Sequence, residues 1–101
     1  MSLPYRFHPL AEQELEASAD LLESERPGIG SEFANAVERA ILQVCEHPQS
    51  SPVARGQVRA KLVLPSTRWP YTVFYRQKGD HIRVLAVAHQ KRQPFYWLGR
   101  Q

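Results

Sequence analysis

The chain has 101 residues, of which 43% are hydrophobic and 23% are charged, and its net charge at neutral pH is +3. This length fits one domain over residues 1–101 with a single modest core, and the composition excludes a disordered chain. The single cysteine, Cys45, cannot form an internal disulfide, and no apolar run approaches the ~20 residues that span a bilayer. We therefore expect a cytoplasmic protein without a membrane partner.

The first expected elements are a short strand and a helix. Tyr5 and Phe7 alternate with Arg6 and His8, which is the pattern of a half-buried strand. Pro9 suits the first turn of a helix, where its missing N–H costs nothing. The buried side of this helix is predicted to consist of the apolar residues at helical spacing, Leu10, Leu15, Ala19 and Leu22.

A second helix is predicted between the segment RPGIG (26–30) and Pro48. Its apolar residues recur at steps of three and four and form the strongest periodic signal in the chain: Ile29, Phe33, Val37, Ile41 and Val44. Cys45 follows this stripe and is predicted to be a small buried residue. The stretch PQSSPVARGQ (48–57) has the composition of a loop.

Beyond residue 57 the periodicity changes to two, which indicates strands. In VRAKLVL (58–64), Val58, Ala60, Leu62 and Leu64 are predicted to face one way and Arg59 and Lys61 the other. YTVFYRQ (71–77) is the next expected strand, and KGD (78–80) is a tight turn into the last one, HIRVLAVAH (81–89). That last strand is apolar on both faces, so it should lie inside the sheet.

These elements, in the order β-α-α-β-β-β, indicate an α+β fold. A two-helix hairpin should pack on a small, mostly antiparallel sheet, and a C-terminal tail should follow the last strand. In this tail, Lys91 and Arg92 are expected at the surface, while Phe95 and Trp97 are expected to fold back onto the sheet.

Charge is distributed unevenly along the chain. Residues 1–54 contain three arginines and nine acidic residues, whereas residues 55–101 contain ten basic residues and one acid, Asp80. This division suggests that the second half binds an anionic partner, either a nucleic acid or an acidic protein segment. The alternative is that acidic helices balance a basic sheet within one molecule.

Six segments of the chain carry a recognisable pattern when they are read in order: FHPLAEQELEA, PGIGSEFANAVERAI, His47-Pro48, VRAKLV, WPYTVFYR and IRVLAVAHQKRQPFYW. Together they resemble the RelE/ParE superfamily of toxins from bacterial type II toxin–antitoxin systems, and the last two are especially similar to the ParE-like, plasmid-stabilisation branch. The resemblance implies the fold predicted above and a growth-inhibiting toxin that a cognate antitoxin neutralises. It also implies that operator DNA is reached only through the antitoxin.

The resemblance leaves the target open. RelE-like members are ribosome-dependent mRNA interferases, which cut mRNA in the ribosomal A site, whereas ParE-like members inhibit DNA gyrase without hydrolysing a substrate. The ParE-like segments favour a non-enzymatic gyrase inhibitor. The alternatives are an endoribonuclease whose partners are the ribosome and mRNA, or an inactive relative that only binds its antitoxin.

RNA cleavage without a metal needs a base, an acid and cations around one phosphate. The candidates for this chemistry are Arg59 and Lys61 on one strand face, Arg83 and His89 on a face of the last strand, and Tyr96 in the tail. The set departs from the RelE pattern, because Gln90 or Lys91 stands where that branch carries an arginine. His89 is alternatively a hydrogen-bonded structural residue.

The residues expected to bind the target or the antitoxin are basic: Arg59, Lys61, Arg76, Arg83, Lys91, Arg92 and Arg100. Bidentate pairing of arginine with carboxylates would make such contacts strong. Arg59 and Lys61 are equally compatible with the solvated face of a strand. The four histidines have no metal-ligand spacing, so neither a metal nor a cofactor is expected.

Overall fold

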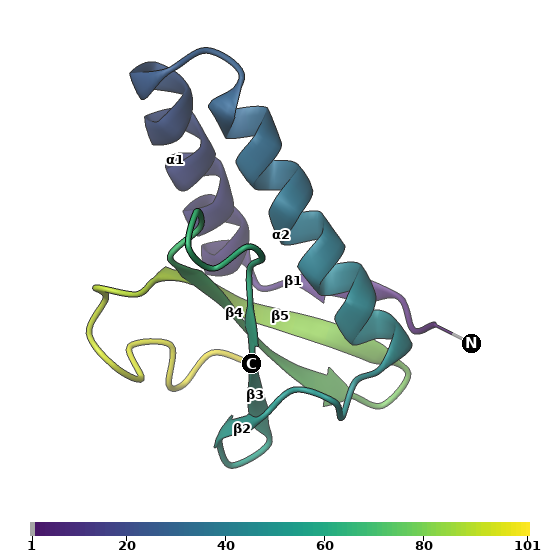
Figure 1. Cartoon of the computed structure of the whole chain (residues 1–101). Coiled ribbons are helices and arrows are strands. Elements are labelled where there is room, and N and C mark those ends of the chain that lie inside the picture. The colour runs from purple at the N-terminus through teal and green to yellow at the C-terminus, as the bar shows by residue number, and fades with distance from the viewer. Residues whose placement is uncertain (1) are drawn as a thin grey trace.

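The computed structural model describes residues 2–101 (Figure 1). Its elements are β1 (Tyr5–Phe7), α1 (Pro9–Glu25), α2 (Ile29–Glu46), β2 (Val53–Arg55), β3 (Val58–Leu62), β4 (Tyr71–Lys78) and β5 (His81–His89). The strands form one sheet in the order β1-β5-β4-β3-β2, with β1 parallel to β5 and the other neighbours antiparallel. The predicted α+β fold, with a helix hairpin on a mostly antiparallel sheet, is confirmed.

The stretch predicted to be a loop, residues 48–57, contains the additional strand β2. Its three residues, Val53–Arg55, pair with β3 across a turn in which Gly56 has φ 57°. The strand lies at the edge of the sheet and its register is interrupted between Val53 and Arg55. Short, irregular edge strands of this kind carry little periodicity, so a composition rich in serine and proline concealed it.

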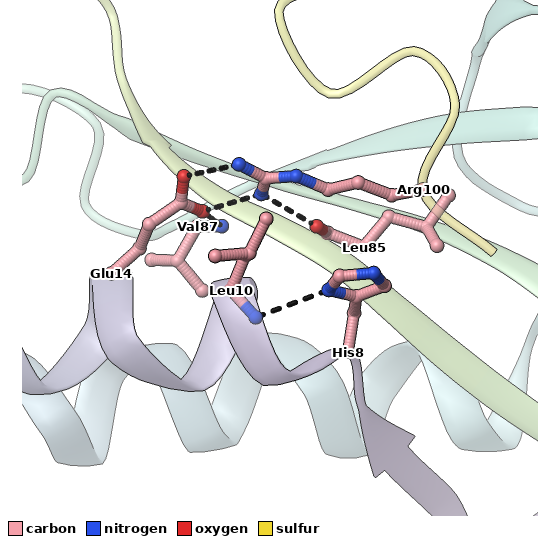
Figure 2. A network of polar contacts seen from close by, with 6 residues as sticks. All are labelled: His8, Leu10, Glu14, Leu85, Val87 and Arg100. Carbon is pink, nitrogen blue, oxygen red and sulfur yellow. Dashed lines mark hydrogen bonds and ion pairs between the residues drawn. The ribbon is translucent and has the colours of Figure 1, made fainter.

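Helix α1 begins where the sequence predicted. Pro9 lies in its first turn, and the Nδ1 atom of His8 accepts a hydrogen bond from the Leu10 N–H at 3.1 Å (Figure 2). The buried stripe, however, starts at Ala11, which is fully buried, whereas Leu10 is 44% exposed. The reason is geometric: the step of five residues from Leu10 to Leu15 turns about 140° around a helix, whereas steps of four keep Ala11 and Leu15 on one side.

Helix α2 supplies most of the helical contribution to the core. Phe33, Val37, Ile41 and Val44 are buried, as the periodicity predicted, and so is Cys45. The two helices approach closely at Gly30, where a Cβ atom would lie 2.5 Å from the Ala19 carbonyl oxygen. The Glu23 carboxylate also accepts hydrogen bonds from the N–H groups of Gly28 and Gly30 at 2.9 and 3.0 Å. Contacts between residues that lie near one another in the sequence therefore hold the two helices of the hairpin together.

The sheet has two differently covered faces (Figure 1). The helix face carries Tyr71, Val73 and Tyr75 of β4, which are buried in the core beneath the helices. The tail face carries Phe74, on which Trp97 of the C-terminal tail packs with ring centroids 4.9 Å apart. Directly opposite residues of neighbouring strands share a face, so the strand registers show on which of the two faces each remaining sheet residue lies.

Strand β5 lies between β1 and β4, as its apolar composition predicted. One residue of β5 is extra: Tyr75 pairs with Val84 and Phe74 pairs with Ala86, so Leu85 forms a bulge. A bulge shifts the alternation of side chains by one residue. Before Leu85 the even-numbered residues of β5 therefore face the helices, whereas after Leu85 the odd-numbered residues do.

Candidate functional site

Arg59 and Lys61 of β3 lie on the helix face rather than on an open one. They pair directly with Tyr75 and Val73, both of which are buried against the helices. The apolar residues on the other side of this segment are not core residues, since Leu62 and Leu64 are 53% and 50% exposed, whereas Val63 is fully buried. The predicted division of this strand into two sides is therefore confirmed by the register, with Arg59 and Lys61 on the side of the helices and Ala60 and Leu62 on the other.

The Arg59 guanidinium holds the loop before β2. Its Nη1 atom donates hydrogen bonds to the carbonyl oxygens of Gln49 and Ser51 at 3.2 and 2.7 Å. The Tyr75 hydroxyl donates to the Pro48 carbonyl oxygen at 2.8 Å beside it. Three loop carbonyls are thus satisfied by two side chains of the sheet, which is how irregular backbone near a core avoids unpaired polar groups.

Arg76 and Arg83 lie directly opposite each other on the tail face. Arg83 donates to the carbonyl oxygens of Phe7 and Gln101 at 3.0 and 3.1 Å. The Nη2 atom of Arg76 donates to the side-chain oxygen of Gln57 at 2.8 Å, whereas its Nε atom is buried without a partner among residues 2–101.

His89 and Arg83 do not share a face, contrary to the sequence prediction. Arg83 opposes Arg76 on the tail face, whereas His89 opposes Tyr71 on the helix face, because the Leu85 bulge shifts the alternation between them. The His89 ring meets the Tyr71 ring edge to face with centroids 5.0 Å apart, and its Nδ1 atom accepts a hydrogen bond from the Lys91 N–H at 3.1 Å. The remaining Nε2 atom then carries the proton of the neutral ring.

The tail turns away from β5 at His89 and presents its charges to solvent. Lys91 and Arg92 are exposed, and the Arg92 guanidinium stacks over the Tyr96 ring, 4.0 Å from its centroid. Trp97 is buried, as expected, and anchors the tail on Phe74. Phe95 also folds back, with its ring edge to face on Trp97 at 5.8 Å and 5.3 Å from the Arg55 guanidinium of β2, but it stays 42% exposed. Its backbone has φ 59°, which is rare for a bulky residue.

Arg100, expected from the sequence to be a surface contact, points inward (Figure 2). Its guanidinium pairs with the Glu14 carboxylate through two 3.1 Å hydrogen bonds and donates to the Leu85 carbonyl oxygen at 2.9 Å. Glu14 went unnoticed among the helical acids. A signal for it exists, since it follows the buried Ala11 by three residues and so lies beside the buried stripe.

Tyr96 lies between the two arginines of the tail. The Arg92 and Arg100 guanidinium groups are 4.0 and 5.0 Å from its ring centroid. Burial, and then the neighbouring Glu14 carboxylate, raise the pKa of Tyr96 to about 12. Its hydroxyl is buried near the Glu14 carboxylate, but no hydrogen bond of ordinary length and angle joins it to any of the described residues. At neutral pH this side chain is a protonated phenol.

A pocket of about 270 Å³ lies between the tail and the ends of β4 and β5, and His89, Arg92 and Tyr96 are among its lining residues. It brings together two of the five candidates for RNA cleavage, His89 and Tyr96. The other three are elsewhere: Arg59 and Lys61 are on β3, and Arg83 is six residues from His89, roughly 20 Å along an extended strand.

Two further properties of residues 2–101 bear on the class of site. No group of three or more histidine, cysteine, aspartate or glutamate side chains in this range is arranged to hold a metal ion. None of its helices combines the length and the apolar character needed to cross a membrane.

Comparisons with known proteins agree with this architecture. A family model described as "ParE toxin of type II toxin-antitoxin system, parDE" matches residues 5–94. The solved structure "Chromosomal ParDE TA system from P. aeruginosa" matches with a TM-score of 0.74 over 87% of this chain and 96% of that chain, at 17% sequence identity, which is a similarity of fold. No curated protein matches the sequence. Since the family model spans nearly the whole chain, this protein belongs to the ParE toxin family of type II toxin–antitoxin systems.

Proposed function

We propose that this protein is a growth inhibitor that binds DNA gyrase without cutting a substrate, and that a cognate antitoxin holds it inactive in the bacterial cytoplasm. Membership of the ParE family supports the toxin role. The observation that favours binding over RNA cleavage is the separation of Arg83 and His89 by the Leu85 bulge and by the length of β5.

Metal-free cleavage requires its base, acid and cations to reach one phosphate at hydrogen-bond distance. Arg59 and Arg83 are instead committed to backbone carbonyl oxygens on opposite faces of the sheet. His89 has its Nδ1 lone pair occupied by the Lys91 N–H, so this ring offers no free base while that hydrogen bond is made. The arrangement supports a protein that acts by occupying its target.

The tail offers the surface for such a contact. Lys91 and Arg92 are exposed beyond the end of β5, and the buried Trp97 fixes the segment that follows them. Fixed cations on a rigid element lose little conformational entropy on binding, which favours affinity. We assign the gyrase contact to this part of the tail.

An mRNA interferase is the second candidate, because His89, Arg92 and Tyr96 line one pocket. In that case Tyr96, with its pKa raised to about 12, would serve as a proton donor to the leaving oxygen. This reading requires ribosome-dependent cuts in mapped transcripts under toxic expression.

The test is a pulse-label of cells after sudden expression of the protein, following DNA and protein synthesis together. If DNA synthesis falls first, purified gyrase should then lose supercoiling activity when the protein is added. If protein synthesis falls first and transcripts are cut, the gyrase mechanism is wrong and the interferase reading replaces it.

Two substitutions sharpen this experiment. Lys91→Glu reverses an exposed charge of the tail and is expected to weaken gyrase inhibition at least tenfold, while Arg26→Glu, at the exposed end of α1, should leave it unchanged. His89→Ala should retain inhibition in a folded protein. Loss of toxicity in His89→Ala with an unchanged unfolding transition would favour the interferase.

A further inference from the structure

Three arginines lie in register across three neighbouring strands. Arg6 of β1 is directly opposite Arg83 of β5, which is directly opposite Arg76 of β4. All three are on the tail face, which the helices do not cover. Neighbouring strands are ~4.8 Å apart, so the backbone positions of this arginine row span about 10 Å.

The arginine row is electrostatically unfavourable in the protein by itself. Like charges directly opposite on a sheet repel each other. Arg83 donates to the Phe7 carbonyl oxygen and Arg76 to the Gln57 amide oxygen, and both of these acceptors are uncharged. Within residues 2–101, none of the three guanidinium groups forms an ion pair with an aspartate or glutamate side chain.

Asp80 is an acid that interacts electrostatically with Arg6 of the row, but it is bonded to another residue. Its carboxylate lies 3.2 Å from the His81 ring nitrogen, and this hydrogen bond is the main reason that the pKa of Asp80 is lowered, with the charge of Arg6 a smaller cause. The Asp80 side chain is almost entirely exposed, at 99%, so its charge is screened by water. The row therefore keeps a surplus of positive charge.

Arg76 adds an independent sign of an incomplete site. Its Nε atom is buried without an acceptor, although five donors of a guanidinium are normally satisfied by protein or water. A carboxylate that drew this side chain outward would exchange an unsatisfied donor for a charge-assisted hydrogen bond. Because its buried Nε atom lacks an acceptor, a movement of Arg76 towards a partner's carboxylate is favoured.

We propose that the arginine row binds carboxylates of an extended acidic segment in a protein partner, and that the segment belongs to the antitoxin. This inference rests on the proposed function for the identity of the partner. Alternate side chains of an extended segment are about 7 Å apart, so two of them match a row of about 10 Å. Guanidinium groups bind carboxylates in a bidentate manner, which gives the contact its geometry.

A nucleic acid is the less suitable occupant. Affinity for a nucleic-acid backbone grows with the number of phosphates neutralised, and three arginines neutralise few. The two faces of the protein also differ in charge, since nine of its ten acids lie in residues 12–46, the region of the two helices. A strand that continued from the row onto the hairpin would therefore meet negative charge.

The experiment uses the full chain and synthetic probes, measured by titration calorimetry. Octaglutamate is expected to bind and to bind more weakly as salt rises. Arg6→Gln/Arg76→Gln should weaken octaglutamate binding at least tenfold, whereas the charge-matched control Arg26→Gln/Arg39→Gln, with both sites exposed on the helices, should change it less than twofold. The variant Arg6→Lys/Arg76→Lys keeps the charge but loses the paired donors of the guanidinium group, and it should weaken octaglutamate binding about threefold.

Each alternative outcome overturns the proposal. Equal weakening in the two glutamine double variants would mean that only total charge matters. Tighter binding of a single-stranded octanucleotide than of octaglutamate, lost in the same variant, would assign the row to nucleic acid. Unfolding curves check the fold of every variant, and the first double variant should be no less stable than the natural chain, because it removes repulsion.

The test also separates this inference from the proposed function. Octaglutamate binding involves no gyrase. A protein that binds the peptide through the arginine row but does not inhibit supercoiling would support the binding role of the row and contradict the gyrase mechanism. If the protein inhibits gyrase but does not bind octaglutamate, the proposed role of the arginine row is wrong and the proposed target still holds.

Discussion

Glu14 of α1 and Arg100 of the tail are 86 positions apart in the sequence and form a bidentate ion pair against the edge of β5 (Figure 2). Strand β1 pairs with β5 only as far as Val84. Beyond it, the Glu14 carboxylate accepts the Val87 N–H and the Arg100 guanidinium donates to the Leu85 carbonyl oxygen. The pair thus satisfies backbone groups that a longer neighbouring strand would otherwise bond.

Removing the carboxylate of this pair should destabilise the protein strongly. The side chains of Arg100 and Glu14 are only 12% and 15% exposed, so Glu14→Gln leaves a largely buried guanidinium without its counter-charge. The free energy of unfolding should fall by about 2–4 kcal/mol. Urea unfolding measures this change, and Glu16→Gln, on the exposed side of α1, is the matched control, for which we expect less than about 0.5 kcal/mol. Equal losses in the two variants would contradict the role of the pair.

His8 should make stability depend on pH. Burial, and then the positive charges of Arg83 and Arg100, lower the pKa of His8 below its usual value of 6.5. Between about pH 6.5 and the lowered pKa, the unfolded chain binds more protons than the folded one, so this contribution to stability is present above pH 6.5 and is lost as the pH falls. His8→Asn keeps a capping side chain without titrating.

The free energy of unfolding, measured in urea at several pH values from 8 to 5, tests this expectation. The natural chain should lose more stability over that range than His8→Asn does. Parallel curves for the two proteins would mean that His8 titrates alike in the folded and unfolded states.

The Tyr96 hydroxyl should lose its proton only at high pH, and the protein should be stable without this hydroxyl. Its pKa is raised to about 12, so its contribution to stability is present below pH 10, the ordinary tyrosine value, and is lost as the pH rises from 10 towards 12. Ultraviolet absorbance titration should show a phenolate transition near pH 12 that is missing in Tyr96→Phe. Because no hydrogen bond of ordinary length and angle joins the hydroxyl to any of residues 2–101, Tyr96→Phe should leave stability at neutral pH unchanged or slightly raised. A loss above about 1 kcal/mol would reveal a hydrogen bond to that hydroxyl.

Gly30 should not tolerate even the smallest side chain. A Cβ atom there would lie 2.5 Å from the Ala19 carbonyl oxygen, which belongs to the backbone of α1 and cannot turn aside. Gly30→Ala should therefore push the helices apart and lower the free energy of unfolding by about 1–3 kcal/mol. Ser31→Ala, at the neighbouring exposed position, is the control and should be close to neutral. Thermal unfolding of both variants distinguishes close helix contact from a general effect of alanine in this turn.

Much of the fold was predictable because its signals are local. The stripe from Ile29 to Val44 gave α2, and the apolar run of residues 81–89 gave an interior strand, since both patterns repeat within one element. The errors occurred where local pattern and packing disagree. Leu62 and Leu64 look like core residues by alternation, yet the pairing of β3 with β4 puts Lys61 on the helix face instead.

The sequence by itself determined the order of the helices and of every strand except β2, the acidic hairpin and basic sheet, and the membership of the ParE-like toxins. Only the tertiary structure decided which basic residues share a surface. A single bulged residue, Leu85, separates Arg83 from His89, and the strand order aligns Arg6 with Arg83 and Arg76. The physical reason is that facing and pairing depend on register between strands far apart in the chain, and no local periodicity encodes where one residue is left unpaired.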